Sequence, residues 1–147
     1  MLDSTRVFDS YASQYGGGIY NTGSLRISHS DISVNTAGSV AGGILNQGEL
    51  TIDSSTLAVN ESDSFGALFN LGHAEINNST FAANYAASDV GALFNRGEME
   101  IRNSTVSQNR SDSAGSDSVG GIANSGQLLL VGSTVADNHS TNGVGGI

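Results

Sequence analysis

Apolar residues recur in this chain at every second position, in short runs that return about every 25 residues. Each period is marked by a Gly-Gly-Ile or Gly-Ala-Leu triplet, and successive triplets are 24, 25 or 29 residues apart. The triplets end at Ile19, Ile44, Leu68, Leu93, Ile122 and Ile147. A spacing of two places alternate side chains on opposite faces of a strand, so the pattern predicts short β-strands and no helices.

Two further apolar groups keep the same period. An apolar pair such as Leu50 and Ile52 follows each triplet, and a Ser-Thr-apolar triplet such as Ser55-Thr56-Leu57 comes next. Each repeat therefore predicts three short strands bounded by glycine or asparagine. A period of about 25 residues without a helix-length pattern argues against ankyrin and leucine-rich repeats, and a propeller blade needs about 40 residues.

These observations predict an all-β fold: a right-handed parallel β-helix (solenoid) of about five coils of roughly 25 residues, with three short strands per coil. Residues 15–147 are expected to form the repeats, and residues 1–14 a degenerate N-terminal coil or cap. In that segment Arg6 is expected to stand in the apolar column that contains Leu57. The longest interval is assigned to a loop insertion at 111–118, and the C-terminal end is expected to be uncapped.

Asparagine occupies two fixed columns of the repeat. Stacked coils place equal positions about 4.8 Å apart, so amides in one column can hydrogen-bond to one another and to the corner backbone. Asn and Gly also tolerate the left-handed backbone that tight corners need. We predict two structural ladders, one of Asn21, Asn46, Asn70, Asn95 and Asn124, and one of Asn35, Asn60, Asn84, Asn109 and Asn138.

Charge and composition narrow the functional classes. The net charge is −9 with no Lys, which argues against nucleic acid because phosphate binding needs clustered cations. With no Cys, disulfides and thiolate metal sites are excluded. No apolar run reaches about 18 residues, so we expect no membrane insertion by this segment. Residues 1–10 show no signal peptide.

Two units carry a family resemblance: Gly16-Gly17-Gly18-Ile19-Tyr20-Asn21 and Gly66-Ala67-Leu68-Phe69-Asn70, with the Gly, Leu-x-Ile and Asn-Ser-Thr elements of the repeat behind them. They resemble the repeats of chlamydial polymorphic outer-membrane proteins and related pectin-lyase-like β-helix domains of bacterial surface proteins. The resemblance covers residues 15–147. It implies a secreted or surface-anchored, adhesin-like bacterial protein, extracellular or at the cell surface.

The outward positions of the second strand carry the charged chemistry. Stacking is expected to place His73 between Glu49 and Glu98 in one column, with further carboxylates in the next. Such a set suits a cation site or acid–base chemistry, and the alternative is a solvated acidic face. The candidate acidic face is Glu49, His73, Glu75, Glu98 and Glu100. No motif is strong enough to assign a catalytic residue, a metal or a cofactor.

The third strand carries an outward threonine column. A regular threonine array can match the ice lattice, whereas the alternative is the ordinary β-propensity of threonine and its pairing across strands. The candidate threonine face is Thr56, Thr80, Thr105 and Thr134.

A column with aromatic residues follows the apolar anchors directly. Strict alternation predicts an exposed stripe that stacks on sugar rings or binds a partner, and burial at a corner is the alternative. The column is Tyr20, Leu45, Phe69, Phe94 and Ala123.

Proteins of this fold have many different activities, so the function has to be inferred from the residues on these outward faces. We expect a non-catalytic cell-surface or secreted β-helix with adhesin-like binding or a spacer role. Its partners would be a host-surface protein or a polysaccharide, with end-to-end self-association as a further contact. The alternatives are a polysaccharide lyase or glycoside hydrolase, in which Glu49 and Glu98 would be the paired carboxylates, and ice binding through the threonine face.

Overall fold

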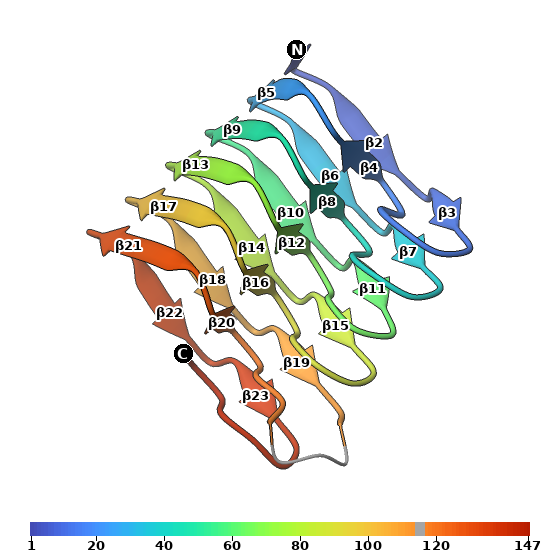
Figure 1. Cartoon of the computed structure of the whole chain (residues 1–147), viewed down its shortest axis with the longest axis vertical. Coiled ribbons are helices and arrows are strands. Elements are labelled where there is room, and N and C mark those ends of the chain that lie inside the picture. The colour runs from blue at the N-terminus through green and yellow to red at the C-terminus, as the bar shows by residue number, and fades with distance from the viewer. Residues whose placement is uncertain (114–116) are drawn as a thin grey trace.

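The chain forms a parallel β-solenoid of about five coils (Figure 1). The structure, a computed structural model, describes residues 1–113 and 117–147. Within these ranges the ordered elements are strands, and no helix is present. Every strand pairs in parallel with its counterpart one repeat away, for example Leu57 with Phe81 and Leu68 with Leu93. The predicted all-β solenoid and its repeat register are confirmed.

The longest strands build what we call the acidic sheet. Its inner residues, such as Leu50 and Ile52, alternate with polar outer residues, as expected for a sheet with one buried face. The six strands are β1 (Leu2–Asp3), β5 (Ser24–Ser28), β9 (Glu49–Asp53), β13 (His73–Asn77), β17 (Glu98–Arg102) and β21 (Gln127–Val131).

The threonine sheet is built from the predicted third strand of each repeat, the Ser-Thr-apolar triplet. It consists of β2 (Arg6–Phe8), β6 (Asp31–Ser33), β10 (Thr56–Ala58), β14 (Thr80–Ala82), β18 (Thr105–Ser107) and β22 (Thr134–Ala136). The predicted position of Arg6 is wrong by one residue. Arg6 pairs with Asp31 and lies outward, while Val7 pairs with Ile32 and fills the apolar column. Arg6 Nε lies 3.1 Å from Oδ2 of Asp31 on the outer face. The inward position is taken by Val7, so the first coil keeps a regular apolar interior.

The first predicted strand of each repeat starts at the apolar anchor and builds the aromatic sheet. Its five strands are β4 (Ile19–Asn21), β8 (Ile44–Asn46), β12 (Leu68–Asn70), β16 (Leu93–Asn95) and β20 (Ile122–Asn124).

Each turn also contains a pair of strand residues between the threonine and aromatic sheets, and these pairs form a narrow fourth ladder. We call it the narrow sheet. Its strands are β3 (Tyr11–Ala12), β7 (Thr36–Ala37), β11 (Glu61–Ser62), β15 (Tyr85–Ala86), β19 (Arg110–Ser111) and β23 (His139–Ser140). The predicted insertion at 111–118 begins at the last residue of β19. Its residues 114–116 lie outside the described residues.

The main core runs along the solenoid axis. Side chains from the acidic, threonine and aromatic sheets meet there, and Ile52, Leu57 and Leu68 are fully buried. Because every coil contributes the same positions, apolar columns stack on one another and exclude water along the axis.

Both predicted asparagine columns form hydrogen-bonded ladders. In the first ladder each side-chain amide donates to Oδ1 of the Asn in the next coil at 2.7–2.8 Å. In the second ladder the same bonds measure 2.8–3.0 Å. A third polar ladder contains Ser30, Ser55 and their equivalents, whose hydroxyls accept a backbone N–H from the preceding coil. Buried polar groups are thus paired from coil to coil.

The left-handed corners use other residues than we expected. The ladder asparagines are not among the residues with positive φ; the residue before the second ladder adopts that conformation instead, as in Val34 (φ 57°), Val59 (φ 56°) and Ala83 (φ 54°). The expectation that Asn forms left-handed corners is therefore wrong for the ladder asparagines, whereas Asn78 (φ 51°) and Asn103 (φ 49°), just before the threonine sheet, do adopt this conformation. The side chains of the ladder asparagines are needed inside the coil, so the preceding residue makes the turn.

Candidate functional site

The outer face of the acidic sheet has the predicted register. His73 lies between Glu49 on β9 and Glu98 on β17. In the adjacent outward column Glu75 is flanked by Thr51 and Glu100. All five candidate residues of the acidic face therefore lie on three neighbouring strands.

The imidazole of His73 lies between two carboxylates. Its Nδ1 is 3.4 Å from Oε2 of Glu98, and its Nε2 is 3.5 Å from Oε1 of Glu75. Glu100 forms an ion pair with Arg102. Arg96, a nearby cation, forms no ion pair within the described ranges, and its guanidinium lies over the Phe94 ring at 5.4 Å from the centroid. Glu49 and Glu98 thus remain exposed carboxylates beside one histidine.

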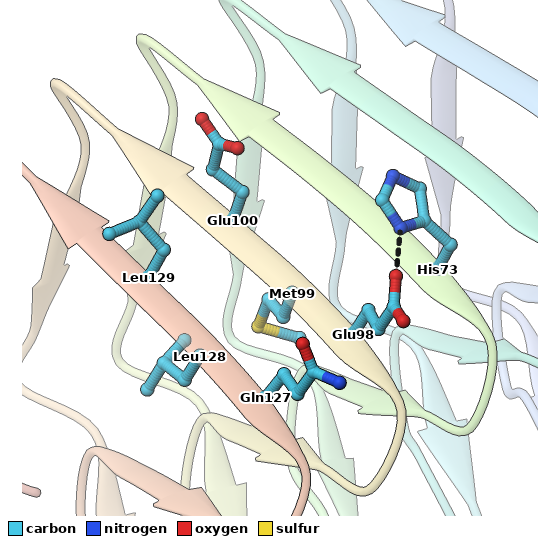
Figure 2. Close-up of a pocket in the computed structure, with 7 residues that line it drawn as sticks. All are labelled: His73, Glu98, Met99, Glu100, Gln127, Leu128 and Leu129. Atoms are coloured by element: carbon cyan, nitrogen blue, oxygen red, sulfur yellow. Dashed lines mark ion pairs between the residues drawn. The ribbon is translucent and has the colours of Figure 1, made fainter.

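A pocket of about 240 Å³ opens beside this cluster (Figure 2). Figure 2 shows His73 and Glu98 facing each other, with Glu100 and Leu129 next to each other further along their strands. The lining residues are His73, Glu98, Met99, Glu100, Gln127, Leu128 and Leu129. The described residues contain no group of three or more side chains placed to hold a metal ion.

A second pocket adjoins the first, and a third adjoins the second. A pocket of about 400 Å³ lies over the corner between the aromatic and acidic sheets, and it shares His73 and Glu98 with the first. Its remaining lining residues are Gln47, Gly48, Glu49, Leu71, Gly72 and Gly97. A third pocket of about 280 Å³ shares Gln47 and Leu71 with the second. Its other lining residues are Tyr15, Tyr20, Val40, Leu45 and Phe69.

Shared walls make the three pockets one continuous surface, which we call the groove. It runs from the outer face of the aromatic sheet, across a glycine corner, to the outer face of the acidic sheet. A Cβ on Gly72 would collide with the carbonyl oxygen of Gly48 in the preceding coil. Only glycine therefore allows the coils to stack this closely at the corner, and backbone lines the middle of the groove.

The column that follows the apolar anchors is largely buried, although strict alternation predicted exposure. Leu45 and Phe69 are 3% and 8% exposed. They pack in a second apolar cluster beneath Phe65 and Val90, which come from the segment that precedes each anchor. The corner-burial alternative is therefore correct for the central coils.

Three phenylalanines form the centre of this second cluster. Phe69 and Phe94 stack with ring centroids 5.3 Å apart, and Phe65 lies 4.6 Å and 4.8 Å from them. In the first coil the equivalent positions hold Tyr15 and Tyr20, which are 50% and 51% exposed. The hydroxyl of Tyr20 donates to Oε1 of Gln47 at 3.0 Å. The aromatic stripe is thus exposed at one end, where it lines the groove.

The threonine face also has the predicted register. Thr56, Thr80, Thr105 and Thr134 occupy one outward column, which continues through Asp31 to Arg6. The guanidinium of Arg6 covers the Phe8 ring at 4.3 Å, so the flat part of the face lies on the later coils. Ice binding through this face stays a prediction, and thermal hysteresis lost in a Thr80→Tyr, Thr105→Tyr variant would support it.

A polar cluster on the narrow sheet was missed in the sequence. Asp112 accepts a hydrogen bond from Arg110 Nε and another from the Thr141 hydroxyl at 3.1 Å. The bond from Arg110 lowers the pKa of Asp112, and burial together with the Asp112 charge raises the pKa of Tyr85. A raised pKa keeps this phenol protonated, as befits a structural residue. Reading the residue after each second-ladder asparagine would have found the column of Tyr85 and Arg110.

No protein-family model, curated protein or solved structure matches this chain. Residues 1–113 and 117–147 also contain no helix long and apolar enough to cross a membrane.

Proposed function

We propose that this solenoid is a non-catalytic binding scaffold whose groove holds an extended segment of a partner macromolecule. One observation carries the proposal: three adjoining pockets form a continuous surface that exposes apolar side chains of Tyr15, Tyr20 and Leu71. Exposed apolar residues gathered in a concave surface are characteristic of interaction sites.

The rigidity of the coils supports this role. The middle of the groove stands on β9, β13 and β17, whose backbones pair on both sides, and buried asparagine ladders lie within the same coils. A preformed surface loses little conformational entropy on binding, so a modest contact area gives measurable affinity.

The repeat motif supports an extracellular setting. The resemblance of Gly66-Ala67-Leu68-Phe69-Asn70 and its equivalents to surface-protein repeats is the basis for proposing a secreted or cell-surface, adhesin-like bacterial protein. In that setting the partner is a surface protein or a polysaccharide, and self-association end to end would present several grooves in one line.

The binding role is tested with fluorescently labelled protein on an array of defined peptides and glycans. We expect bound probes to be lost by a Tyr20→Ser, Leu71→Ser variant and retained by Tyr11→Ser. Tyr11 is 73% exposed on the narrow sheet, away from the groove, and is the matched control. Equal binding by the wild type and the groove variant would overturn the proposal.

A polysaccharide-active enzyme is the second candidate, and it is favoured by one observation. His73 lies within 3.5 Å of two carboxylates at the edge of an open pocket, an arrangement that suits proton transfer. Turnover on a panel of acidic polysaccharides that is abolished in Glu98→Gln would establish this candidate. Binding without turnover favours the scaffold.

A further inference from the structure

The groove changes its chemistry along its length. Its first part is apolar and aromatic, around Tyr20 and Leu71. Its middle is glycine backbone flanked by Glu49, His73 and Glu98, and its far end reaches the exposed side chain of Leu129. The order is therefore apolar, acidic, apolar.

We propose that the occupant is an extended segment of a partner protein in which basic residues are flanked by apolar ones. The inference rests on the proposed binding function and specifies the partner: arginine or lysine beside the carboxylates, and a large apolar side chain at each end of the groove.

Charge complementarity selects a cationic centre. The Glu98 side chain is 62% exposed and the Glu75 side chain 54% exposed, and among residues 1–113 and 117–147 His73 is the one basic group that contacts either. Arg102 is already paired with Glu100, and Arg96 lies over an aromatic ring. With a net charge of −9 on the chain, the field at this face attracts cations and repels anions.

The apolar ends select side chains with apolar bulk. Tyr20 exposes half of its surface and Leu71 is 39% exposed, while Phe69 closes the floor beneath them. At the other end Leu129 is 49% exposed beside the partly buried Leu128. Covering these surfaces removes apolar area from water, which adds affinity that is insensitive to salt.

The glycine corner selects an extended backbone. Gly48, Gly72 and Gly97 present no side chain between the aromatic and acidic parts. The backbone of a partner can therefore approach the corner closely. Its side chains can then contact the aromatic part of the groove on one side and the acidic part on the other. A polysaccharide repeats the same short unit along its length, so it does not present a single cationic centre between two apolar ends. The apolar-acidic-apolar order of the groove therefore favours a peptide.

The test measures fluorescence anisotropy with a labelled peptide that has two apolar residues at each end and lysines and arginines between them. We expect Glu49→Gln, Glu98→Gln protein to bind this peptide about tenfold more weakly than the wild type at low salt. Glu61→Gln, Asp63→Asn also removes two carboxylate charges, at exposed residues outside the groove, and is expected to bind like the wild type.

Three comparison probes complete the experiment. Oligolysine without apolar ends should bind more weakly than the peptide, and a peptide with glutamates at its centre should not bind. Tighter binding of a glucosamine oligomer, or equal binding of the acidic peptide, would overturn the proposal. If the array probes that bind the wild type but not the Tyr20→Ser, Leu71→Ser variant are neutral or anionic, the cationic partner is refuted and the scaffold function stands. If no probe distinguishes the wild type from that variant, both proposals are refuted. Circular dichroism of each variant checks that it is folded.

Discussion

The side-chain amide nitrogen of Asn46 lies 2.7 Å from Oδ1 of Asn70 in the next coil, and both residues are fully buried. The same nitrogen donates to the carbonyl oxygens of Gly48, at its own corner, and His73, in the next coil. One amide thus joins a corner, a neighbouring side chain and a neighbouring strand. A slip of one residue between coils would leave these buried groups unpaired, so the ladder maintains the register that builds the groove.

Asn70→Ala is expected to lower the free energy of unfolding by about 2–4 kcal/mol, because it leaves several buried polar groups without partners. The lost bonds include those from Asn70 to Oδ1 of Asn95 at 2.8 Å and to the carbonyl oxygen of Glu98 at 2.9 Å. Urea unfolding followed by circular dichroism measures the change.

Asn124→Ala is the matched control at the exposed end of the same ladder. Solvent replaces its lost hydrogen bonds, so the expected loss is below about 1 kcal/mol. Equal losses for the two variants would show that burial of the ladder does not stabilise the coil.

Gly72→Ala is expected to destabilise the protein by about 2 kcal/mol or more, since the added methyl group meets the backbone of Gly48 and the coils must separate. Gly23 occupies the same column in the first coil and has open space around it. Gly23→Ala should therefore be neutral or slightly stabilising. Thermal unfolding compares the pair, and similar melting temperatures would contradict close stacking at this corner.

The period of the apolar residues was sufficient to predict the strands of the acidic, threonine and aromatic sheets and their register from the second coil onward, whereas the two-residue strands of the narrow sheet were not predicted. Once Ile44, Leu68 and Leu93 are aligned, parallel stacking also fixes the remaining columns of the repeat. It places His73 between Glu49 and Glu98. This works because neighbouring coils repeat the same contacts, so a local pattern determines the long-range pairing.

The first coil shows where this reasoning fails. Asp3-Ser4-Thr5 imitates the Ser-Thr-apolar motif, which places Arg6 in the apolar column. In the structure Thr5 occupies the serine position, so Arg6 falls in the outward column, where its partner is Asp31. The exclusion of an unpaired charge from the core decides the register, and a motif match does not.

The groove could not be predicted from the columns alone. Phe65 and Val90 precede the anchors by three residues, and they fold over Phe69 only because the chain turns back at the narrow sheet. Whether an outward residue is covered depends on this tertiary contact. The burial of this column in the central coils and the exposure of Tyr20 in the first coil therefore become evident only from the three-dimensional structure.

Val59→Asn is expected to stabilise the protein by about 1 kcal/mol. Val59 has φ 56° and is 54% exposed. Its β-branched side chain therefore strains a left-handed corner, and little burial of the side chain offsets that strain. Asn adopts this conformation at lower cost. Val131→Asn is the control, because Val131 is an exposed valine in a regular strand and its replacement should destabilise. A lower melting temperature for Val59→Asn would contradict the assignment of strain to this corner.

Asp112→Asn is expected to lower thermal stability near neutral pH and to have a smaller effect in acid. The hydrogen bond from Arg110 holds the pKa of Asp112 below its ordinary value of 3.8. A lowered pKa contributes stability that is fully present above the unfolded-state pKa and is lost as the pH falls through the folded-state value. The difference in melting temperature between wild type and variant should therefore shrink as the pH falls below about 4. Arg110→Gln should reproduce this profile, and the double variant should lose less than the sum of the two single variants, because both residues belong to one pair. A difference that stays constant across this pH range would show that the Asp112 carboxylate does not act through its charge.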